Sequence, residues 1–182
     1  MDAWKGCDDW LQFSNVGFSY SSWALHFHGC DNLKLNSPNI DGIDISSSRN
    51  VFIQHTSIGT GDDCIAINGG CSDLNIANIA CGPGHGISLG ANGALEKVNN
   101  VYVKDCSFSR TTNGARIKTW QGGSGRASAL SVDYVKYIDF EGTCASEEAI
   151  KLDCDQNSGC HNIIPHQNHF CGSWQEDLCL LQ

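Results

Sequence analysis

A short pattern that recurs at a fixed spacing constrains the fold of this chain more than any other feature. It begins at Asp41, Asp63 and His85, where the sequence reads DGIDI, DCIAI and HGISL, and the two intervals are equal. Short strands and turns that repeat at a fixed period of about 20–30 residues are typical of a solenoid, in which each repeat forms one rung and strands stack on their counterparts. The pattern therefore predicts an all-β, parallel solenoid whose successive rungs lie about 4.8 Å apart.

Other short alternations of β-branched and polar residues lie between turns that are rich in Gly, Asn and Ser. None of them keeps the 3.6-residue period of a helix over a helical length. They form two families that alternate along the chain. The segments expected as strands are 42–46, 50–54, 64–68, 74–78, 86–90, 100–104, 115–119, 137–140 and 149–153.

Stacked in this register, one set of aliphatic side chains points into the solenoid and the residues between them point outward. Arg116 and Lys118 belong to the outward set. The pairs expected to point inward are Ile43 and Ile45, Ile65 and Ile67, Ile87 and Leu89, Ala115 and Ile117, and Ile150 and Leu152.

The composition fits one soluble, globular domain. The chain has 182 residues, 41% of them hydrophobic, and lacks an apolar run near the ~18 residues that a membrane span requires. Its formal net charge of -9 argues against non-specific binding to nucleic acid or to an anionic membrane. An anionic polymer would have to be held locally, at a basic segment where two acids, Glu96 and Asp105, stand among six cations. These are Lys97, Lys104, Arg110, Arg116, Lys118 and Arg126.

The eleven cysteines indicate a disulfide-bearing secreted protein with at least one thiol left over, because the number is odd. They lack paired CxxC spacings and the seven histidines lack the spacing of metal ligands, so neither a metal nor another cofactor is expected. His26 and His28 alternate along one expected strand and are interpreted as structural. The first residues, MDAWKGCDDW, lack the features of a signal peptide. Either the start of the chain is missing, or the chain as written does not reach an oxidising compartment.

Stacking the repeats also brings polar residues together at one corner of the solenoid. Asp41, Asp63 and His85 take the same lateral position on three consecutive rungs, and Asp62 lies beside them. Such a ladder can be structural, since Asn and Asp often cap turns. Three carboxylates and a histidine in register, close to two cations, favour a chemical role. Clustered carboxylates do not all ionise readily, so one of them is expected to keep its proton.

The segments around this corner read SPNIDGIDISSSRNVFIQ, SIGTGDDCIAI, CGPGHGISLG and TTNGARIKTWQGGSG. Together they resemble the plant polygalacturonases, the pectin-cleaving glycoside hydrolases of family 28, whose motifs are Asn-x-Asp, Gly-Asp-Asp, Gly-His-Gly and Arg-Ile-Lys. All four motifs occur in order between Asn39 and Lys118, and the resemblance continues more loosely to about Cys160. It implies a right-handed parallel β-helix with rungs of about 22–30 residues.

The resemblance implies hydrolysis of α-1,4-galacturonosyl linkages with inversion of configuration. Asp62 would be the general acid, and Asp63 and Asp41 would together hold and deprotonate the attacking water. Inverting glycosidases separate the two carboxyl groups by about 6.5–9.5 Å, and adjacent rungs are expected to supply such a spread. His85 would tune the protonation of the site and order it.

The remaining residues implied by the resemblance bind the substrate or stabilise the fold. Arg116 and Lys118 would bind the carboxylate of the galacturonate ring at the cleavage point. The expected disulfides are Cys64–Cys81, whose cysteines match positions of the family, and Cys154–Cys160.

The chain departs from the family in two ways. It has Asn39-Ile40-Asp41 where the family has Asn-Thr-Asp. It is also much shorter than the family's domain, and rungs expected from the family are absent after HGCDNLKL and after GGSGRASA. We therefore expect residues 1–182 to be a single β-helix domain that is incomplete at its N-terminus and lacks internal rungs.

These features predict a secreted, extracellular or cell-wall hydrolase that acts as a monomer on pectin or polygalacturonate. The alternative is a catalytically inactive β-helix that binds pectin or a cell-wall partner without cleaving it. The complete set of motif residues favours the enzyme, whereas the missing rungs favour the binding protein.

Overall fold

The computed structural model describes residues 4–5, 11–14, 25–36, 42–90, 97–118, 131–138, 141–143, 150–153, 160–166 and 169–171. All regular structure in these ranges is β-strand, and every pairing between strands is parallel. No helix long and apolar enough to cross a membrane occurs in them. The fold is the predicted all-β, parallel β-helix.

One sheet, here named sheet A, contains seven strands. Strands that are neighbours in this sheet are never consecutive in the chain, because the chain coils through a second sheet before it returns. In order across the sheet, the strands are β1 (Trp4–Lys5), β3 (Leu25–His28), β5 (Ile43–Ser46), β7 (Ile65–Ile67), β9 (Ile87–Gly90), β12 (Ala115–Lys118) and β15 (Ile150–Asp153).

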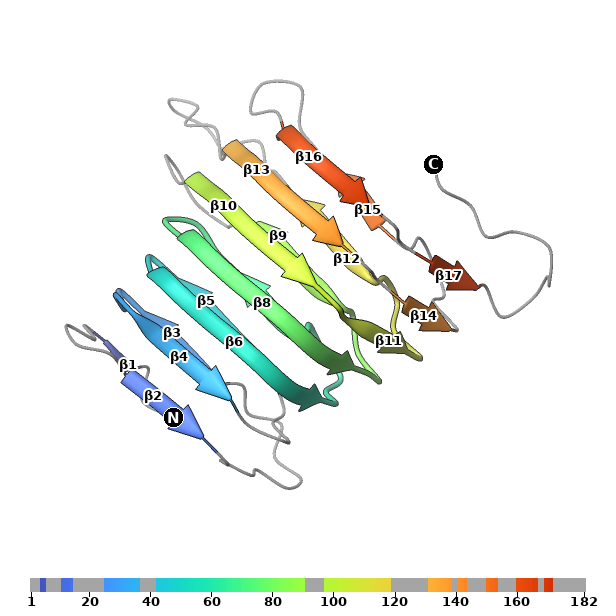
Figure 1. The fold of residues 1–182 in the computed structure, drawn as a ribbon, viewed down its shortest axis with the longest axis horizontal. Coiled ribbons are helices and arrows are strands. Elements are labelled where there is room, and N and C mark those ends of the chain that lie inside the picture. Colours follow the sequence, from blue (N-terminus) through green and yellow to red (C-terminus); the bar gives the residue numbers. More distant parts are fainter. Residues whose placement is uncertain are drawn as a thin grey trace, which may run out of the picture.

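The second sheet, sheet B, contains ten strands and lies in front of sheet A in Figure 1. Its long central strand β8 (Ser72–Cys81) pairs with β10 (Lys97–Lys104) along its first part and with β11 (Ser107–Ser109) at its end. The other strands are β2 (Leu11–Ser14), β4 (Leu33–Asn36), β6 (Arg49–Ile58), β13 (Ser131–Ile138), β14 (Glu141–Thr143), β16 (Cys160–His166) and β17 (His169–Cys171). The segments expected as strands all overlap strands of these two sheets, and the two alternating families correspond to sheet A and sheet B.

The pairing register of sheet A measures the length of each rung. Ile43 pairs with Ile65 and Ile65 with Ile87, which confirms the constant step that the sequence predicts for these rungs. Other rungs differ in length. Fewer residues than expected separate Leu25 from its partner Ile43, and more than expected separate Ala115 from its partner Ile150. The short rung has a physical basis, because its strand in sheet B, β4, has four residues whereas β6 and β8 each have ten.

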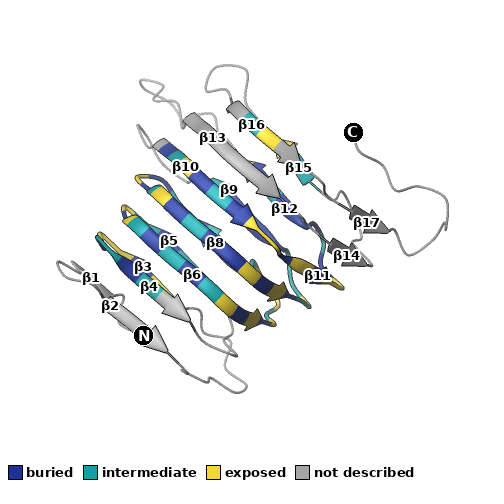
Figure 2. Cartoon of the chain, viewed as in Figure 1, coloured by how far each residue is buried: buried dark blue, intermediate teal, exposed yellow. Residues whose placement is uncertain are grey.

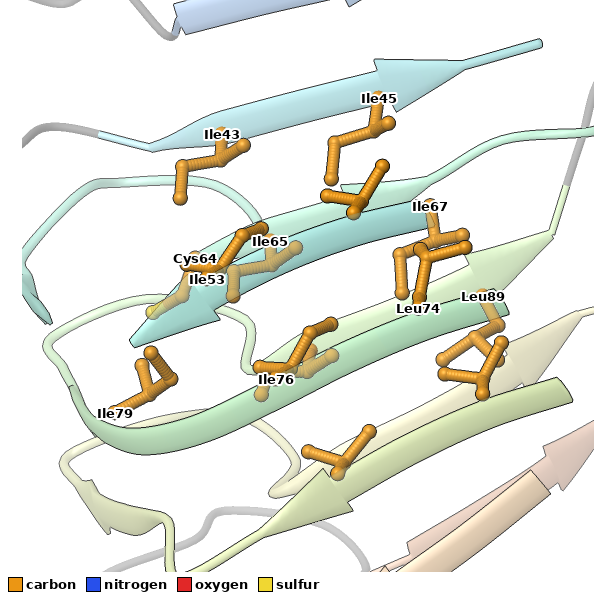
Figure 3. Close-up of a cluster of buried hydrophobic side chains, with 14 of the residues drawn as sticks. Ile43, Ile45, Ile53, Cys64, Ile65, Ile67, Leu74, Ile76, Ile79 and Leu89 are labelled. Carbon is orange, nitrogen blue, oxygen red and sulfur yellow. The ribbon is translucent and has the colours of Figure 1, made fainter. Parts of the chain in front are cut away.

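The core consists of aliphatic side chains between the two sheets. Figure 3 shows Ile43, Ile45, Ile65 and Ile67 from sheet A together with Ile53, Leu74 and Ile76 from sheet B, and each is at most 1% exposed. Ile87, Leu89, Ala115 and Ile117 are also fully buried, as predicted.

The expected pair Ile150 and Leu152 differs from the other inward pairs. Ile150 packs against the core, whereas Leu152 is 52% exposed. The reason is position, because β15 is the last strand of sheet A and no strand of the sheet lies beyond it in the part of the chain that the structure describes. On the central strands β6 and β8, by contrast, buried residues recur along the strand between more exposed ones (Figure 2).

A ladder of polar residues runs along the beginnings of the strands of sheet B. Asn32, Asn50, Asp73 and Asn100 all have positive φ, between 53° and 63°, a conformation that Asn and Asp adopt more readily than most residues. The Asn50 side-chain amide donates to Asn32 Oδ1 over 3.2 Å, and that of Asn100 donates to Asp73 Oδ1 over 2.9 Å. At this corner the polar stack is structural.

The cysteines serve the fold in two ways. Cys64 and Cys81 form a disulfide with a Cα–Cα distance of 6.0 Å, which ties the turn before β7 to the end of β8. Cys106 is a buried free thiol, and burial raises the pKa of this thiol to about 12. The expected Cys154–Cys160 pair lies outside the described residues, since Cys154 and the side chain of Cys160 are not among them.

Candidate active site

Two turns at the same edge of sheet A place three predicted site residues side by side. Asp62 and Asp63 directly precede β7, and His85 precedes β9 on the next rung. The His85 amide donates to the carbonyl of Asp62 over 2.9 Å, and the Cys64 amide donates to that of Gly86 over 2.8 Å, so the ladder of sheet A continues through both turns. His85 Nδ1 lies 3.2 Å from Asp62 Oδ1. The repeat therefore brings these residues together as the sequence predicts.

The glycines around His85 allow the turns to approach this closely. Gly86 has a φ of +93°, and a Cβ at this position would lie 2.2 Å from the carbonyl oxygen of Asn113. A Cβ on Gly84 would lie 2.8 Å from the carbonyl oxygen of Asp62. The Gly-His-Gly motif thus has a steric origin, because a side chain on either glycine would push neighbouring rungs apart.

The two aspartates have very different surroundings although they are adjacent in sequence. The Asp62 side chain is 84% exposed, and its Oδ1 accepts a hydrogen bond from the Asp63 amide over 2.8 Å. The Asp63 side chain is 19% exposed, and its Oδ1 accepts a hydrogen bond from the Ser88 hydroxyl over 2.7 Å. Arg116 Nη2 lies 3.5 Å from the same oxygen. Asp63 is therefore held in place, whereas Asp62 faces solvent.

The predicted cations lie on the outward face of β12. Arg116 is 16% exposed, and its Nε is buried without a hydrogen-bond partner in the described structure. Lys118 is exposed and lies two residues further along the strand, on the same face. Lys104, from the same basic segment of the sequence, lies in sheet B, 3.4 Å from Asp105. The basic segment is thus divided between the two sheets, and Arg116 is the cation of β12 that contacts a carboxylate of the site.

Two further points concern the expected ligands of this site. Asp41 lies outside the described residues, so its place in the corner stays a prediction. Suitable atoms of Asp62, Asp63 and His85 lie within 4.8 Å of one another, and in the described structure this is the one group of such side chains close enough to hold a metal ion. Exposed acidic groups commonly cluster in this way without an ion.

The sequence did not point to Ser88, and it did not show the contacts of the β3 histidines, which were interpreted as structural. Ser88 is 7% exposed and stands in register with Ala66 and Arg116, so counting along the rungs could have found it. His26 Nδ1 lies 3.0 Å from Asp44 Oδ2, on the next strand of the same outward face, and Asn68 donates to the other oxygen of Asp44. This network was not visible from the alternation of β3 alone.

Comparison with known proteins agrees with this architecture. Residues 23–139 match the profile of the glycosyl hydrolases family 28. A probable polygalacturonase of Arabidopsis thaliana is 40% identical over 209 residues, covering 88% of this chain and 46% of that relative. Polygalacturonase-2 of Solanum lycopersicum is 37% identical over 178 residues, covering 78% and 39%. The chain therefore spans less than half the length of these relatives.

A solved structure shows the same fold. The crystal structure of endo-xylogalacturonan hydrolase from Aspergillus tubingensis superposes with a TM-score of 0.69 at 23% identity, covering 91% of this chain and 50% of that one. On the strength of the family match and of relatives at about 40% identity over most of its length, the chain belongs to the glycosyl hydrolases family 28.

Proposed function

We propose that this protein hydrolyses α-1,4-galacturonosyl linkages of pectin or polygalacturonate by general acid–base catalysis. The observation that carries the proposal is the difference between the two adjacent carboxylates. Asp62 is exposed at the outer edge of the site, where it can protonate a leaving oxygen, and Asp63 is fixed by Ser88 and Arg116, where it can orient and deprotonate water.

His85 and Asp41 complete the proposed acid–base set. The contact of His85 Nδ1 with Asp62 Oδ1 supports a role of the imidazole in ordering the acid. Asp41, one rung before Asp63 in the repeat, would share the attacking water with it.

The cations of β12 suit an anionic sugar. Lys118 extends into solvent on the face that carries the carboxylates, and Arg116 has a buried Nε that makes no hydrogen bond in the described structure. A guanidinium and an ammonium two residues apart on one strand can bind the carboxylate of a galacturonate unit through charge-assisted hydrogen bonds. Arg116 and Lys118 are therefore expected to make the protein bind de-esterified pectin more tightly than methyl-esterified pectin.

The stereochemistry of the reaction rests on the family resemblance. Carboxylate oxygens of Asp62 and Asp63 lie within 4.8 Å of each other, closer than the roughly 6.5–9.5 Å typical of inverting glycosidases. The close approach arises because the two residues are adjacent in sequence instead of standing on different rungs. We propose inversion, and proton NMR of the anomer that forms first during turnover tests this: accumulation of the retained anomer would contradict it.

We further propose that the protein acts outside the cell, in the wall, as a monomer and without a cofactor. The Cys64–Cys81 disulfide supports an oxidising compartment, because such bonds persist where thiols are not kept reduced. Pectin-type polysaccharide is the partner that the family membership supports.

A second candidate function is binding of pectin without cleavage. Two observations favour binding without cleavage: the rung that contains β4 is short, and the chain covers less than half of its Arabidopsis relative. The alignment with the Arabidopsis relative also spans 209 positions, more than the 182 residues of this chain, which supports the proposal that internal rungs are missing.

One pair of measurements separates the two candidates. Release of reducing ends from polygalacturonate measures hydrolysis, and co-sedimentation with the same insoluble polymer measures binding. We expect both from the purified chain. Binding without release of reducing ends would support the second candidate, and absence of both would overturn the proposal.

A further inference from the structure

Ser88 lies beside Asp63, at the corner that also holds Asp62 and His85, and neither the motifs nor the family resemblance identified it. It is the middle of the sequence Ile87-Ser88-Leu89 on β9, whose two aliphatic side chains fill the core. The Ser88 side chain therefore points to the outward face, yet only 7% of the residue is exposed. An outward-facing hydroxyl this well covered requires a hydrogen-bond partner, because burying an unpaired hydroxyl is costly.

That partner is the carboxylate of Asp63. The hydroxyl donates to Asp63 Oδ1 over 2.7 Å, a normal length for a hydroxyl–oxygen hydrogen bond. The residue beside Ser88 on β7 is Ala66, which has no polar group to compete for the hydroxyl. The bond joins the turn before one rung to the strand of the next, so it fixes Asp63 relative to the rest of sheet A.

The second contact of Asp63 is weaker and comes from Arg116, which is also proposed to bind the substrate. Arg116 Nη2 lies 3.5 Å from the same Oδ1, at the outer limit for a hydrogen bond. A guanidinium that turns toward the carboxylate of a bound sugar would loosen this contact further. Ser88 has no such competing partner among the described residues, because its well-covered hydroxyl donates to Asp63 alone. Both contacts engage Oδ1, and among the described residues none is recorded at Oδ2.

We propose that Ser88 is a positioning residue that holds the Asp63 carboxylate in place, with Oδ2 turned toward the attacking water, while Arg116 engages the substrate. The inference rests on the proposed hydrolytic function. A hydroxyl that donates to a carboxylate restricts the rotation of that side chain, and a general base acts when it lies within hydrogen-bond reach of the proton it takes. Removing the hydroxyl should therefore leave Asp63 less well oriented.

Replacement of Ser88 by alanine tests this in two independent ways. In S88A, kcat on polygalacturonate should fall roughly ten- to a hundredfold with KM within about twofold of the parent, as for loss of a hydrogen bond to a charged group. A crystal structure of S88A should show the Asp63 carboxylate turned away from its position in the parent chain.

Two further variants provide the controls. S88T keeps the hydroxyl on a β-branched side chain suited to a strand and should keep kcat close to that of the parent. S46A removes a hydroxyl from the same outward face two rungs away, where Ser46 bonds to His28 over 2.8 Å, and should leave both kcat and the position of the Asp63 carboxylate unchanged.

The outcomes distinguish this inference from the proposed function. A parent chain without turnover would overturn the proposed function, and the position of the Asp63 carboxylate in S88A would still decide whether Ser88 holds it. An active parent whose S88A variant keeps its kcat, with Asp63 in its parent position, would overturn the positioning role alone. A fall in kcat together with a lower melting temperature and an unmoved Asp63 carboxylate would assign Ser88 to the packing of the sheet.

Discussion

The chemistry of the corner depends on how two consecutive residues are exposed. Asp62 and Asp63 share one turn, yet the first is 84% exposed and the second 19%. The second lies under the side chains of β9 and β12, which bond to it from the next two rungs. One turn thus supplies an exposed carboxylate and a fixed one, which is the difference on which the proposed function rests.

Replacing Asp62 by asparagine should remove turnover and leave the fold intact. General acid–base groups typically contribute 10²–10⁴-fold, and an exposed carboxylate adds little to stability. The measurements are the rate of reducing-end release and the melting temperature. Asp105→Asn, at an exposed acid between β10 and β11 with a φ that asparagine tolerates, is the matched control. A loss smaller than about tenfold would remove Asp62 from the acid role.

Lys118 is expected to act on substrate and not on stability. Lys118→Gln should lower kcat/KM on polygalacturonate by roughly ten- to a hundredfold, mainly through KM, with the melting temperature unchanged. The loss should be smaller on fully methyl-esterified pectin, where no carboxylate is available to pair with.

Lys104→Gln, which removes a half-exposed lysine from sheet B, provides the comparison for Lys118. Equal losses on both polymers would show that Lys118 does not recognise the carboxylate.

At the scale of single elements, the turn that carries His85 depends on its glycines. Gly86→Ala places a Cβ 2.2 Å from the Asn113 carbonyl oxygen at a φ of +93°, so it should lower the free energy of unfolding by more than about 1 kcal/mol. Gly61→Ala, in the neighbouring turn, adds a Cβ with no atom within 4 Å and is the control. Chemical denaturation of the two variants should separate them, and equal midpoints would contradict the steric explanation.

The ion pair between the turn after β3 and the start of β6 should make stability depend on pH. Arg49 Nη2 donates to Asp31 Oδ2 over 2.6 Å, and this bond holds the pKa of Asp31 below its usual value. A carboxylate with a lowered pKa stabilises the fold above its unfolded pKa of about 3.9 and loses this effect as the pH falls through the folded value.

Arg49→Gln should therefore lower the melting temperature slightly at pH 7 and not at about pH 2. The effect at pH 7 is small because both side chains are partly exposed. Thermal melts of parent and variant across this range provide the measurement. A difference that persists in acid would show that Arg49 stabilises the rung by packing instead.

At the scale of the whole molecule, each rung contacts the rungs next to it, so central and terminal rungs should differ in their contribution to stability. Ile65→Ala in the central rung should cost about 2–5 kcal/mol, because a fully buried side chain leaves a cavity. Leu152→Ala on the end strand, where the side chain is 52% exposed, should cost about 0.5 kcal/mol. Urea denaturation would measure both, and similar costs would contradict this distribution of stability.

The sequence predicts the rungs well where side-chain alternation and a constant interval coincide, as from Ile43 to Leu89. It does so because inward aliphatic residues and the strand period are local properties. The shorter step before Ile43 could not be predicted, since the length of β4 depends on what it pairs with. Ser88 was missed for a similar reason, because its partner, Asp63, lies on another rung and the contact appears only when the register is fixed.

The rungs that connect neighbouring strands of sheet A differ in their number of residues, and this has a consequence for how such proteins evolve. Neighbouring rungs of different length pair in the same parallel register, because each strand presents the same row of donors and acceptors to the next. After an in-frame deletion of one coil, the two strands brought together can therefore still pair through their backbone hydrogen bonds. The outward surface then shortens by one strand spacing of about 4.8 Å, and the corner that holds Asp62, Asp63 and His85 is left unaltered. Lineages of this architecture can thus change the length of their outward surface by gaining or losing coils, while Asp62, Asp63 and His85 keep their places relative to one another.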